Sequence, residues 1–546
     1  MRLYTLFALG SFITASLCIE NAFAAPSTVG DAPIPQIESL VSNNLSAGAS
    51  VSDGVFTYRY NNARDGHNPN EVILTPANVA SSNFKKVRTF AVDGAIYAQP
   101  LYAKNVATAK GNLNLIFIAT EHNSVYAFDA DLKIPGPIWK TNFNVNGATP
   151  VPARDTQSTE IIPEIGITST PVIDPATGML YTVAYTKRTG KYYYHLHALD
   201  ITNGKEPITS PRSLDASVPG TGEGNEAGQV WLRPLHLKQR TALSLSKGLI
   251  TIAFASHEDV DPYHGWVLAY DAKTLRQVAK LNVTPNTQRA GIWMSGDGPA
   301  IDGAGNLYLA TSNGGFEGKT EFGDTVLKLT PNLKVLDYFS PRGQLSFDDN
   351  KDLGSGGIML FTTPGGLDLV VQGGKLDSLY FVKQASFGDH SDPLAPMAPY
   401  QVIEGVAGAS YGTPAYFNNI IYTHGAHMVL KAFKVQGNSV IETPISEGAI
   451  VSGNPGVRLG GTSPVVSSNG LENGIVWELN NDGWQTNARA ILYAYDAKDL
   501  SKLLYSSSAL LGDRAGPSVK FTAPLVIDGK VFIGNNKQVT VYALRN

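Results

Sequence analysis

The segment ASHEDVDPYHGWVLAYDAKTL, residues 255–275, sets an acid-rich loop between two strongly apolar runs that are typical of β-strands. Its second run, VLAYDA, belongs to a set of similar runs spread along the chain. The eight copies are VYAFDA at 125, LHALDI at 196, VLAYDA at 267, VLKLTP at 326, LYFVKQ at 379, LKAFKV at 430, LYAYDA at 492 and VYALRN at 541. Each follows another apolar run, and upstream of most of these lies a third, often marked by proline. The chain therefore contains an internal repeat, whose copies follow one another at intervals of 49 to 71 residues.

This repeat predicts an all-β fold. The 54 Gly, 32 Pro, 24 Tyr and 21 Phe supply turn formers and residues suited to pleated surfaces. Three strands plus a more variable outer strand are typical of a propeller blade, so we predict one eight-bladed β-propeller of four-stranded antiparallel blades over residues 55–546. Two separate β-sandwiches would not explain the recurrence. Because the last copy ends at the C-terminus, residues 54–62 (GVFTYRYNN) are the expected donor of its outer strand, which would remove free sheet edges.

The N-terminus predicts export. It reads MRLYTLFALGSFITASLCIENAFAAPS, with one Arg, an apolar run and the small-x-small pattern of Ala22, Phe23 and Ala24. We therefore expect a signal peptide over residues 1–24, a flexible segment over 25–54, and a periplasmic or secreted bacterial protein. Cys18, the only cysteine, lies in this leader, so the mature protein has no disulfide, c-type haem or thiolate metal site.

Composition excludes some partners. The formal net charge of -4 and the pI near 6.2 give no broad positive field that would attract nucleic acid. No segment after the leader approaches the roughly 18 uninterrupted apolar residues of a membrane helix. The expected product is a monomer whose partner is an unidentified small molecule or protein.

In a propeller, the loops between the second and third strands of the blades lie on one face. Polar residues in these loops are therefore expected to converge around a central funnel, although each alone is also compatible with a solvated turn. They are Glu121 and His122, Lys187 and Arg188, His257 and Glu258, Asn313, Lys375, His424 and His427, residues 480–482, and residues 535–537.

The VYAFDA and VLAYDAKTL units resemble the repeat of pyrroloquinoline-quinone dehydrogenases, the quinoprotein alcohol dehydrogenase-like propellers, over about residues 55–546. The resemblance implies site residues one motif at a time. Glu258 before GWVLAYDA and Asn313 in TSNGG match the family's calcium ligands, and Trp293 in AGIWMSGDG matches the tryptophan that stacks on the quinone. Asp352 in NKDLGSGG matches the catalytic base, and Lys375 in QGGKLDSLYF matches the cation beside the quinone.

Together these residues suit one chemistry. Calcium takes carboxylate and amide oxygens and would polarise a quinone carbonyl, while a carboxylate could accept the hydroxyl proton of an alcohol or sugar. The family's vicinal cysteine pair and a haem motif are both missing, and NKDLGSGG keeps little of the catalytic motif beyond the acid. Two hypotheses therefore stand: a binding or scaffold protein that uses the funnel face without full dehydrogenase activity, and a calcium- and quinone-dependent dehydrogenase of an alcohol or sugar.

Overall fold

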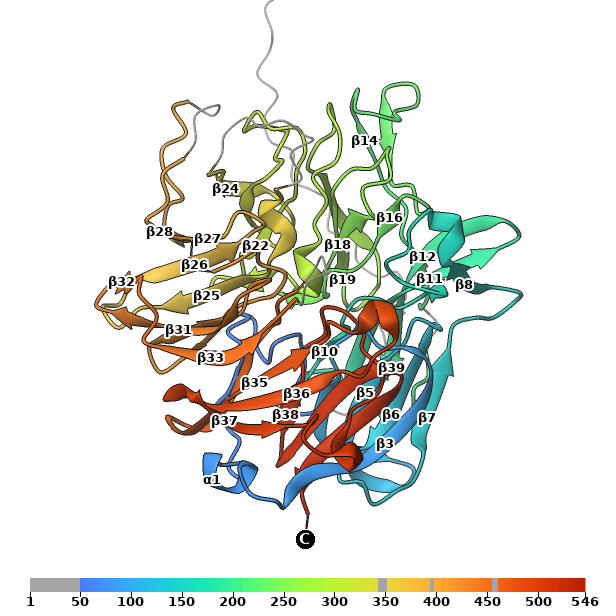
Figure 1. The fold of residues 1–546 in the computed structure, drawn as a ribbon. Coiled ribbons are helices and arrows are strands. Elements are labelled where there is room, and N and C mark those ends of the chain that lie inside the picture. The colour runs from blue at the N-terminus through green and yellow to red at the C-terminus, as the bar shows by residue number, and fades with distance from the viewer. Residues whose placement is uncertain are drawn as a thin grey trace, which may run out of the picture. The chain divides into compact units, whose positions relative to one another are not determined.

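The recurrent runs all form β-strands in the computed structural model. It describes residues 50–207, 209–341, 351–392, 397–405, 407–453 and 460–545, which belong to one compact unit that begins at Asn44. The predicted leader and most of the predicted flexible segment lie outside the described residues. Within these ranges, eight sheets of three to six strands and one two-stranded ribbon follow one another along the chain (Figure 1).

The first four sheets contain the first four repeats. The first sheet contains β4 (Leu101–Thr108), β5 (Gly111–Ala119), β6 (Ser124–Asp129) and β7 (Pro137–Asn142), joined by β1 (Gly54–Val55). The second sheet contains β8 (Thr149–Pro152), β9 (Glu164–Ile165), β10 (Val172–Asp174), β11 (Met179–Arg188), β12 (Lys191–Asp200) and β13 (Arg212–Ser213). The third sheet contains β16 (Leu237–Lys238), β17 (Ser244–Ser246), β18 (Leu249–Ser256), β19 (Trp266–Asp271) and β20 (Gln277–Asn282), and the fourth contains β21 (Ala300–Ile301), β22 (Leu307–Ala310), β23 (Val326–Leu329) and β24 (Val335–Phe339). The ribbon of β14 (Ser217–Pro219) and β15 (Gln229–Trp231) lies between the second and third sheets in the sequence.

The last four sheets contain the other repeats. The fifth sheet contains β25 (Ile358–Thr362), β26 (Asp368–Gly373), β27 (Ser378–Lys383) and β28 (Gln401–Glu404), and the sixth contains β29 (Ala415–Phe417), β30 (Ile420–Thr423), β31 (Val429–Gln436), β32 (Ser439–Val440) and β33 (Ser446–Val451). The seventh sheet contains β34 (Val465–Asn469), β35 (Glu472–Asn480), β36 (Ile491–Asp496) and β37 (Asp499–Ser506), joined by β2 (His67–Asn68). The eighth sheet contains β38 (Leu525–Ile527) and β39 (Lys530–Leu544), joined by β3 (Phe84–Ala95).

The recurrent runs occupy similar places in successive sheets. Seven of the eight runs, on β6, β12, β19, β23, β27, β31 and β36, pair antiparallel with the strand before them, and the eighth lies in β39. The sheets are not uniformly four-stranded, because short segments of the N-terminal region and of the connections add strands to several of them.

The predicted donor of the last outer strand is wrong. The strand that completes the last sheet is β3, whose residues from Phe84 to Ala95 pair antiparallel with β39 (Figure 1, blue beside red). Residues 54–62 cannot take that place, because the left-handed φ values of Arg59 (56°) and Tyr60 (71°) are incompatible with a continuous strand. Phe84 and Phe90 of β3 are buried instead, which anchors this strand on the last sheet.

Residues 54–66, here called the inner segment, contact every sheet. The backbone N–H groups of Ile173 (β10), Ile301 (β21), Leu360 (β25), Tyr416 (β29) and Val466 (β34) donate to carbonyls of residues 56, 62, 63, 65 and 66 at 2.7 to 2.9 Å. Three further contacts are the pairing of β1 with β4, the bond from Arg64 Nη2 to Ser244 Oγ of β17 (2.7 Å), and the bond from Val526 N of β38 to Tyr60 Oη (2.9 Å). One short stretch thus touches the first strand of each repeat, which requires those strands to converge.

Two arginines fix the inner segment. Arg59 and Arg64 are fully buried and donate to carbonyls of the recurrent prolines that precede the first strands. Arg59 bonds to Pro464 O (3.0 Å) and Pro414 O (2.6 Å), and Arg64 Nη2 bonds to Pro299 O (3.1 Å). The guanidinium groups therefore satisfy backbone acceptors that no sheet partner reaches.

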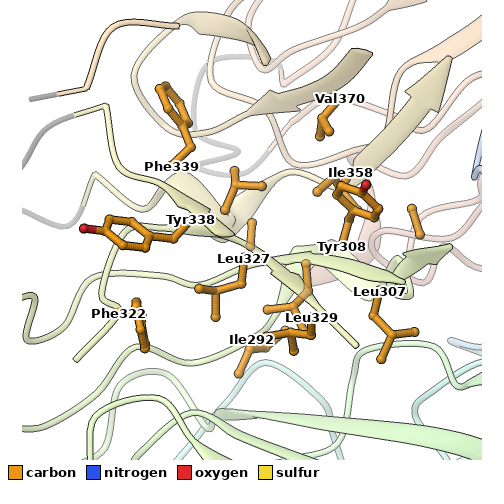
Figure 2. Close-up of a cluster of buried hydrophobic side chains, with 14 of the residues drawn as sticks. Ile292, Leu307, Tyr308, Phe322, Leu327, Leu329, Tyr338, Phe339, Ile358 and Val370 are labelled. Atoms are coloured by element: carbon orange, nitrogen blue, oxygen red, sulfur yellow. The ribbon is translucent and has the colours of Figure 1, made fainter. Parts of the chain in front are cut away.

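Apolar side chains fill the space between neighbouring sheets. Figure 2 shows one such cluster, in which Leu327 of β23 lies with Ile358 of β25 and Val370 of β26. All three are completely buried. Sheets covered on both faces explain why the strands read as continuous apolar runs instead of a simple alternation.

Helix is scarce in the described ranges, where the one α-helix, α1 (Pro76–Val79), accompanies five 3₁₀ turns. These turns are Ala153–Thr156, Met294–Gly296, Leu353–Ser355, Trp484–Thr486 and Leu511–Asp513. Among the described residues, no helix is both long enough and apolar enough to cross a membrane.

Candidate ligand-binding site

A cavity of about 110 Å³, here called the Trp293 cavity, opens among connecting segments and strand ends of several sheets. Its walls combine acidic, basic and aromatic side chains from several sheets. They are Glu160, Lys238, Ala255, Ser256, Glu258, Asp259, Tyr263, Gly291, Trp293, Ser312, Asp352, Lys375 and Tyr411.

The structure brings the five predicted site residues together. Glu258, Trp293, Asp352 and Lys375 line the Trp293 cavity. Asn313 is attached to them, because its backbone N–H donates to Asp352 Oδ1 at 3.1 Å. Motifs spread over more than a hundred residues of sequence therefore meet at one place.

Glu258 occupies the turn between β18 and β19. Its φ of 50° and the φ of 56° at Asp259 are left-handed, so the chain turns sharply there. The Glu258 side chain is exposed, and its Oε2 accepts a hydrogen bond from Thr159 N at 2.8 Å. Asp259 Oδ1 accepts from Tyr263 Oη at 2.6 Å, and burial together with this carboxylate raises the pKa of Tyr263 well above its usual value. Both acids border the cavity, and the Asp259 carboxylate is also engaged by Tyr263 within the turn.

Asp352 is held by its neighbours. It is only 5% exposed, its Oδ1 accepts from Asn313 N, and its Oδ2 forms an ion pair with Lys375. Lys375 N also donates to the Asp352 backbone carbonyl at 2.9 Å. Burial acts to lower the pKa of Lys375, but the Asp352 carboxylate outweighs it and the pKa lies above its usual value. In this arrangement Asp352 positions Asn313 and Lys375, and both of its oxygens are engaged.

Trp293 belongs to an aromatic cluster that the sequence did not reveal. Its ring packs edge-to-face against Phe521, with centroids 5.3 Å apart, and against Tyr411 at 6.2 Å. A signal for both partners existed in the repeat: Tyr411 and Phe521 each stand three residues before the proline that opens a first strand. Extending the repeat alignment upstream by those three residues would have found them.

Glu160 was also missed, because it lies in an irregular loop that no repeat marks. Its carboxylate forms ion pairs with Lys238 and Lys520, both only 5% exposed at the side chain. Burial opposes ionisation of Glu160, yet the two ammonium groups outweigh it and hold the pKa of this carboxyl well below its usual range. Burial lowers the pKa of Lys520. Glu160 and Lys238 line the Trp293 cavity, and Lys520 pairs with Glu160 without lining it.

Other members of the predicted polar ring serve the fold. Glu121 is buried and its Oε2 accepts from Gly166 N at 2.7 Å, and burial raises its pKa to about 7. His257 is buried, which lowers its pKa to about 3. Lys187 pairs with Asp155 at 2.6 Å. The convergence of loops is therefore real, but only part of the ring faces a common cavity.

Pyrroloquinoline quinone does not fit the cavity as it stands, and acidic side chains alone do not make a calcium site there. Among the residues that the structure describes, no three acidic, histidine or cysteine side chains are grouped to hold a metal. The cavity of about 110 Å³ is also well below the roughly 300–1,000 Å³ of sites for drug-sized ligands, a class that includes a tricyclic quinone. The residue types agree with the resemblance, and the available space does not.

Comparisons with known proteins give the fold. No family model and no curated protein matches this chain. Among solved structures, it is similar to the quinohemoprotein alcohol dehydrogenases of Comamonas testosteroni (TM-score 0.58, 12% identity, covering 90% of this chain and 80% of that chain) and Pseudomonas putida (0.61, 13%, 90% and 80%). It is also similar to a europium-containing methanol dehydrogenase (0.59, 14%, 90% and 98%). At these identities the likeness shows the fold alone: a quinoprotein-like β-propeller.

Proposed function

We propose that this chain is an exported, eight-bladed, quinoprotein-like propeller that acts as a binding protein, with a small polar molecule held in the Trp293 cavity. The observation that carries the proposal is the meeting of Glu258, Trp293, Asp352 and Lys375 around one cavity. Eight blades are supported by the inner segment, which contacts all eight sheets. Export is supported by the signal-peptide pattern of residues 1–24.

The size and lining of the cavity define the ligand class. Its volume of about 110 Å³ is smaller than the roughly 150 Å³ of an apolar cavity that accepts benzene, so the ligand has only a few non-hydrogen atoms. The exposed carboxylate of Glu258 is an acceptor for hydroxyl or amino groups, and Trp293 offers an aromatic surface. Asp352 and Lys375 support this wall through their mutual ion pair.

Calorimetric titration with glycerol, ethanolamine and glycolate tests this function with a neutral, a cationic and an anionic probe. We expect at least one probe to bind with a Kd on the order of millimolar or tighter, and Glu258→Gln and Trp293→Leu each to weaken it at least about tenfold. Trp231→Phe, at an exposed tryptophan on β15, is the control and should leave binding unchanged. Absence of heat with all three probes would contradict the proposal.

A calcium- and quinone-dependent dehydrogenase of an alcohol or sugar is the second candidate, favoured by the gathering of all five predicted residues. It requires Trp293 to move away from Tyr411 and Phe521, because the present cavity is too small for the quinone.

Calorimetric titration of the purified protein with pyrroloquinoline quinone in the presence of calcium tests this candidate. The heat of binding is measured, so the test does not depend on enzymatic turnover. A binding protein is expected to show no quinone binding even at high micromolar concentrations. Tight binding that both Glu258→Ala and Trp293→Ala abolish would replace the binding-protein proposal with the dehydrogenase.

A further inference from the structure

A second and larger cavity, here called the Trp484 cavity, has a volume of about 570 Å³. This value lies within the range of sites that enclose small molecules, roughly 300–1,000 Å³. Its lining residues come from five separate parts of the chain. They are Ala95, Tyr97, Thr159, Glu160, Ile162, Pro163, Trp484, Gln485, Asn487, Ser518, Val519 and Asn536.

Local structure fixes the walls of this cavity. Trp484 begins a 3₁₀ turn after β35 that ends at Thr486, and the next residue, Asn487, has a left-handed φ of 55°. Ser518 lies in the segment before β38, where its backbone N–H donates to Ala488 O at 2.8 Å. The ammonium of Lys520 lies 4.4 Å from the centre of the Trp484 ring, which holds the indole in place. These contacts hold the loop of Trp484, between β35 and β36, in place.

Two buried polar groups of this wall have no hydrogen-bond partner among the described residues. They are the indole Nε1 of Trp484 and the hydroxyl of Ser518, a residue that is only 5% exposed. Burying a polar group without a partner costs about 1–3 kcal/mol. The indole N–H can only donate, so a bound molecule that satisfies it must carry an acceptor.

Among its described lining residues the cavity has one charged side chain, that of Glu160. This carboxylate is ion-paired with Lys238 and Lys520, neither of which lines the cavity. The remaining polar side chains are amides and hydroxyls, chiefly Gln485, Asn487 and Asn536, which both donate and accept. Two rings, Tyr97 and Trp484, supply flat apolar surface. Such walls suit a neutral ring that bears many hydroxyl groups, and they offer no cationic cradle for phosphate.

We infer that the Trp484 cavity is a binding site for a neutral saccharide of one or two rings. Sugar hydroxyls would accept from Trp484 Nε1 and Ser518 Oγ and exchange hydrogen bonds with the amides, while the C–H faces of the ring pack on the aromatic walls. The inference goes beyond the proposed function and does not depend on binding in the Trp293 cavity.

The test is calorimetric titration of the full-length protein with glucose, maltose and cellobiose. Sodium benzoate, a charged aromatic ligand, is titrated in the same way for comparison. At least one sugar is expected to bind in the millimolar range or tighter, and Trp484→Phe and Ser518→Ala should each weaken that binding at least about tenfold. Trp231→Phe is the matched tryptophan control. Trp293→Leu, in the other cavity, should leave sugar binding unchanged, so the two proposals can fail separately.

Three outcomes would overturn the inference: no heat with any of the three sugars up to about 50 mM, sugar binding that survives in both Trp484→Phe and Ser518→Ala, or benzoate binding that is stronger than sugar binding and is lost in these two variants. Ser518→Ala removes one hydroxyl and keeps the shape of the site, so a folding defect in Trp484→Phe would not leave the result open.

Discussion

Replacing Arg64 by Met is expected to lower the free energy of unfolding by about 3–5 kcal/mol, the range found when one partner of a buried charged network is removed. Arg64 is fully buried and donates to Pro299 O, Tyr58 O (2.8 Å) and Ser244 Oγ. The substitution leaves these acceptors unpaired inside the protein and loosens the inner segment from the third and fourth sheets. The midpoint of guanidinium unfolding measures the loss.

The loss should also depend on pH through Asp297. This buried carboxyl accepts from Gly298 N and Ile358 N, and burial raises its pKa to about 6 although the arginines oppose that rise. A group whose pKa is raised on folding stabilises the protein at low pH, and that contribution is lost as the pH rises through the folded pKa. Without Arg64 the pKa of Asp297 rises further, so the deficit of the variant should be larger at pH 8 than at pH 5.5.

Arg154→Met is the matched control, because the Arg154 side chain is 87% exposed and its loss should change stability by no more than about 0.5 kcal/mol. Equal stability of Arg64→Met and Arg154→Met would refute the anchoring role of Arg64.

Glu160→Gln is expected to cost about 3–5 kcal/mol at pH 7, because it leaves Lys238 and Lys520 buried beside each other without a carboxylate. The pKa of Glu160 is lowered on folding, so its stabilising contribution is present above the unfolded pKa near 4.5 and is lost as the pH falls below it. The difference between wild type and variant should therefore shrink by up to about 1.4 kcal/mol for each pH unit below that value.

Chemical unfolding of both proteins at pH 7 and pH 3.5 measures this convergence. Glu472→Gln provides the control, since this side chain is 76% exposed and its distance to Lys498 is 3.9 Å. A stability difference that stays constant between the two pH values would show that Glu160 acts by packing alone.

The repeat can be identified from the sequence because it is a local signal. A strand buried on both faces must be apolar along its whole length, so VLAYDA and its relatives indicate strands wherever they stand. The same periodicity leads to the Trp293 region, since residues in corresponding loops of a repeat converge on one face. Together with the family resemblance, it predicts one shared location for Glu258, Trp293, Asn313, Asp352 and Lys375.

The closing strand and the site's remaining walls depended on tertiary structure. Phe84 and Phe90 become buried only when β3 lies on β39, a pairing between the two ends of the described chain. Arg59 and Arg64 read as exposed charges in the sequence, yet they are buried because proline carbonyls surround them. Glu160 likewise meets Lys520 across 360 positions of sequence.

The sequence by itself thus determined which segments form strands and which loops share a face, because burial on both sides of a sheet and repeat position are encoded in neighbouring residues. Only the tertiary structure decided which strand closes the last sheet, how large the cavities are and which charges are paired. Those properties arise from contacts between distant segments, whose geometry and desolvation no local pattern records.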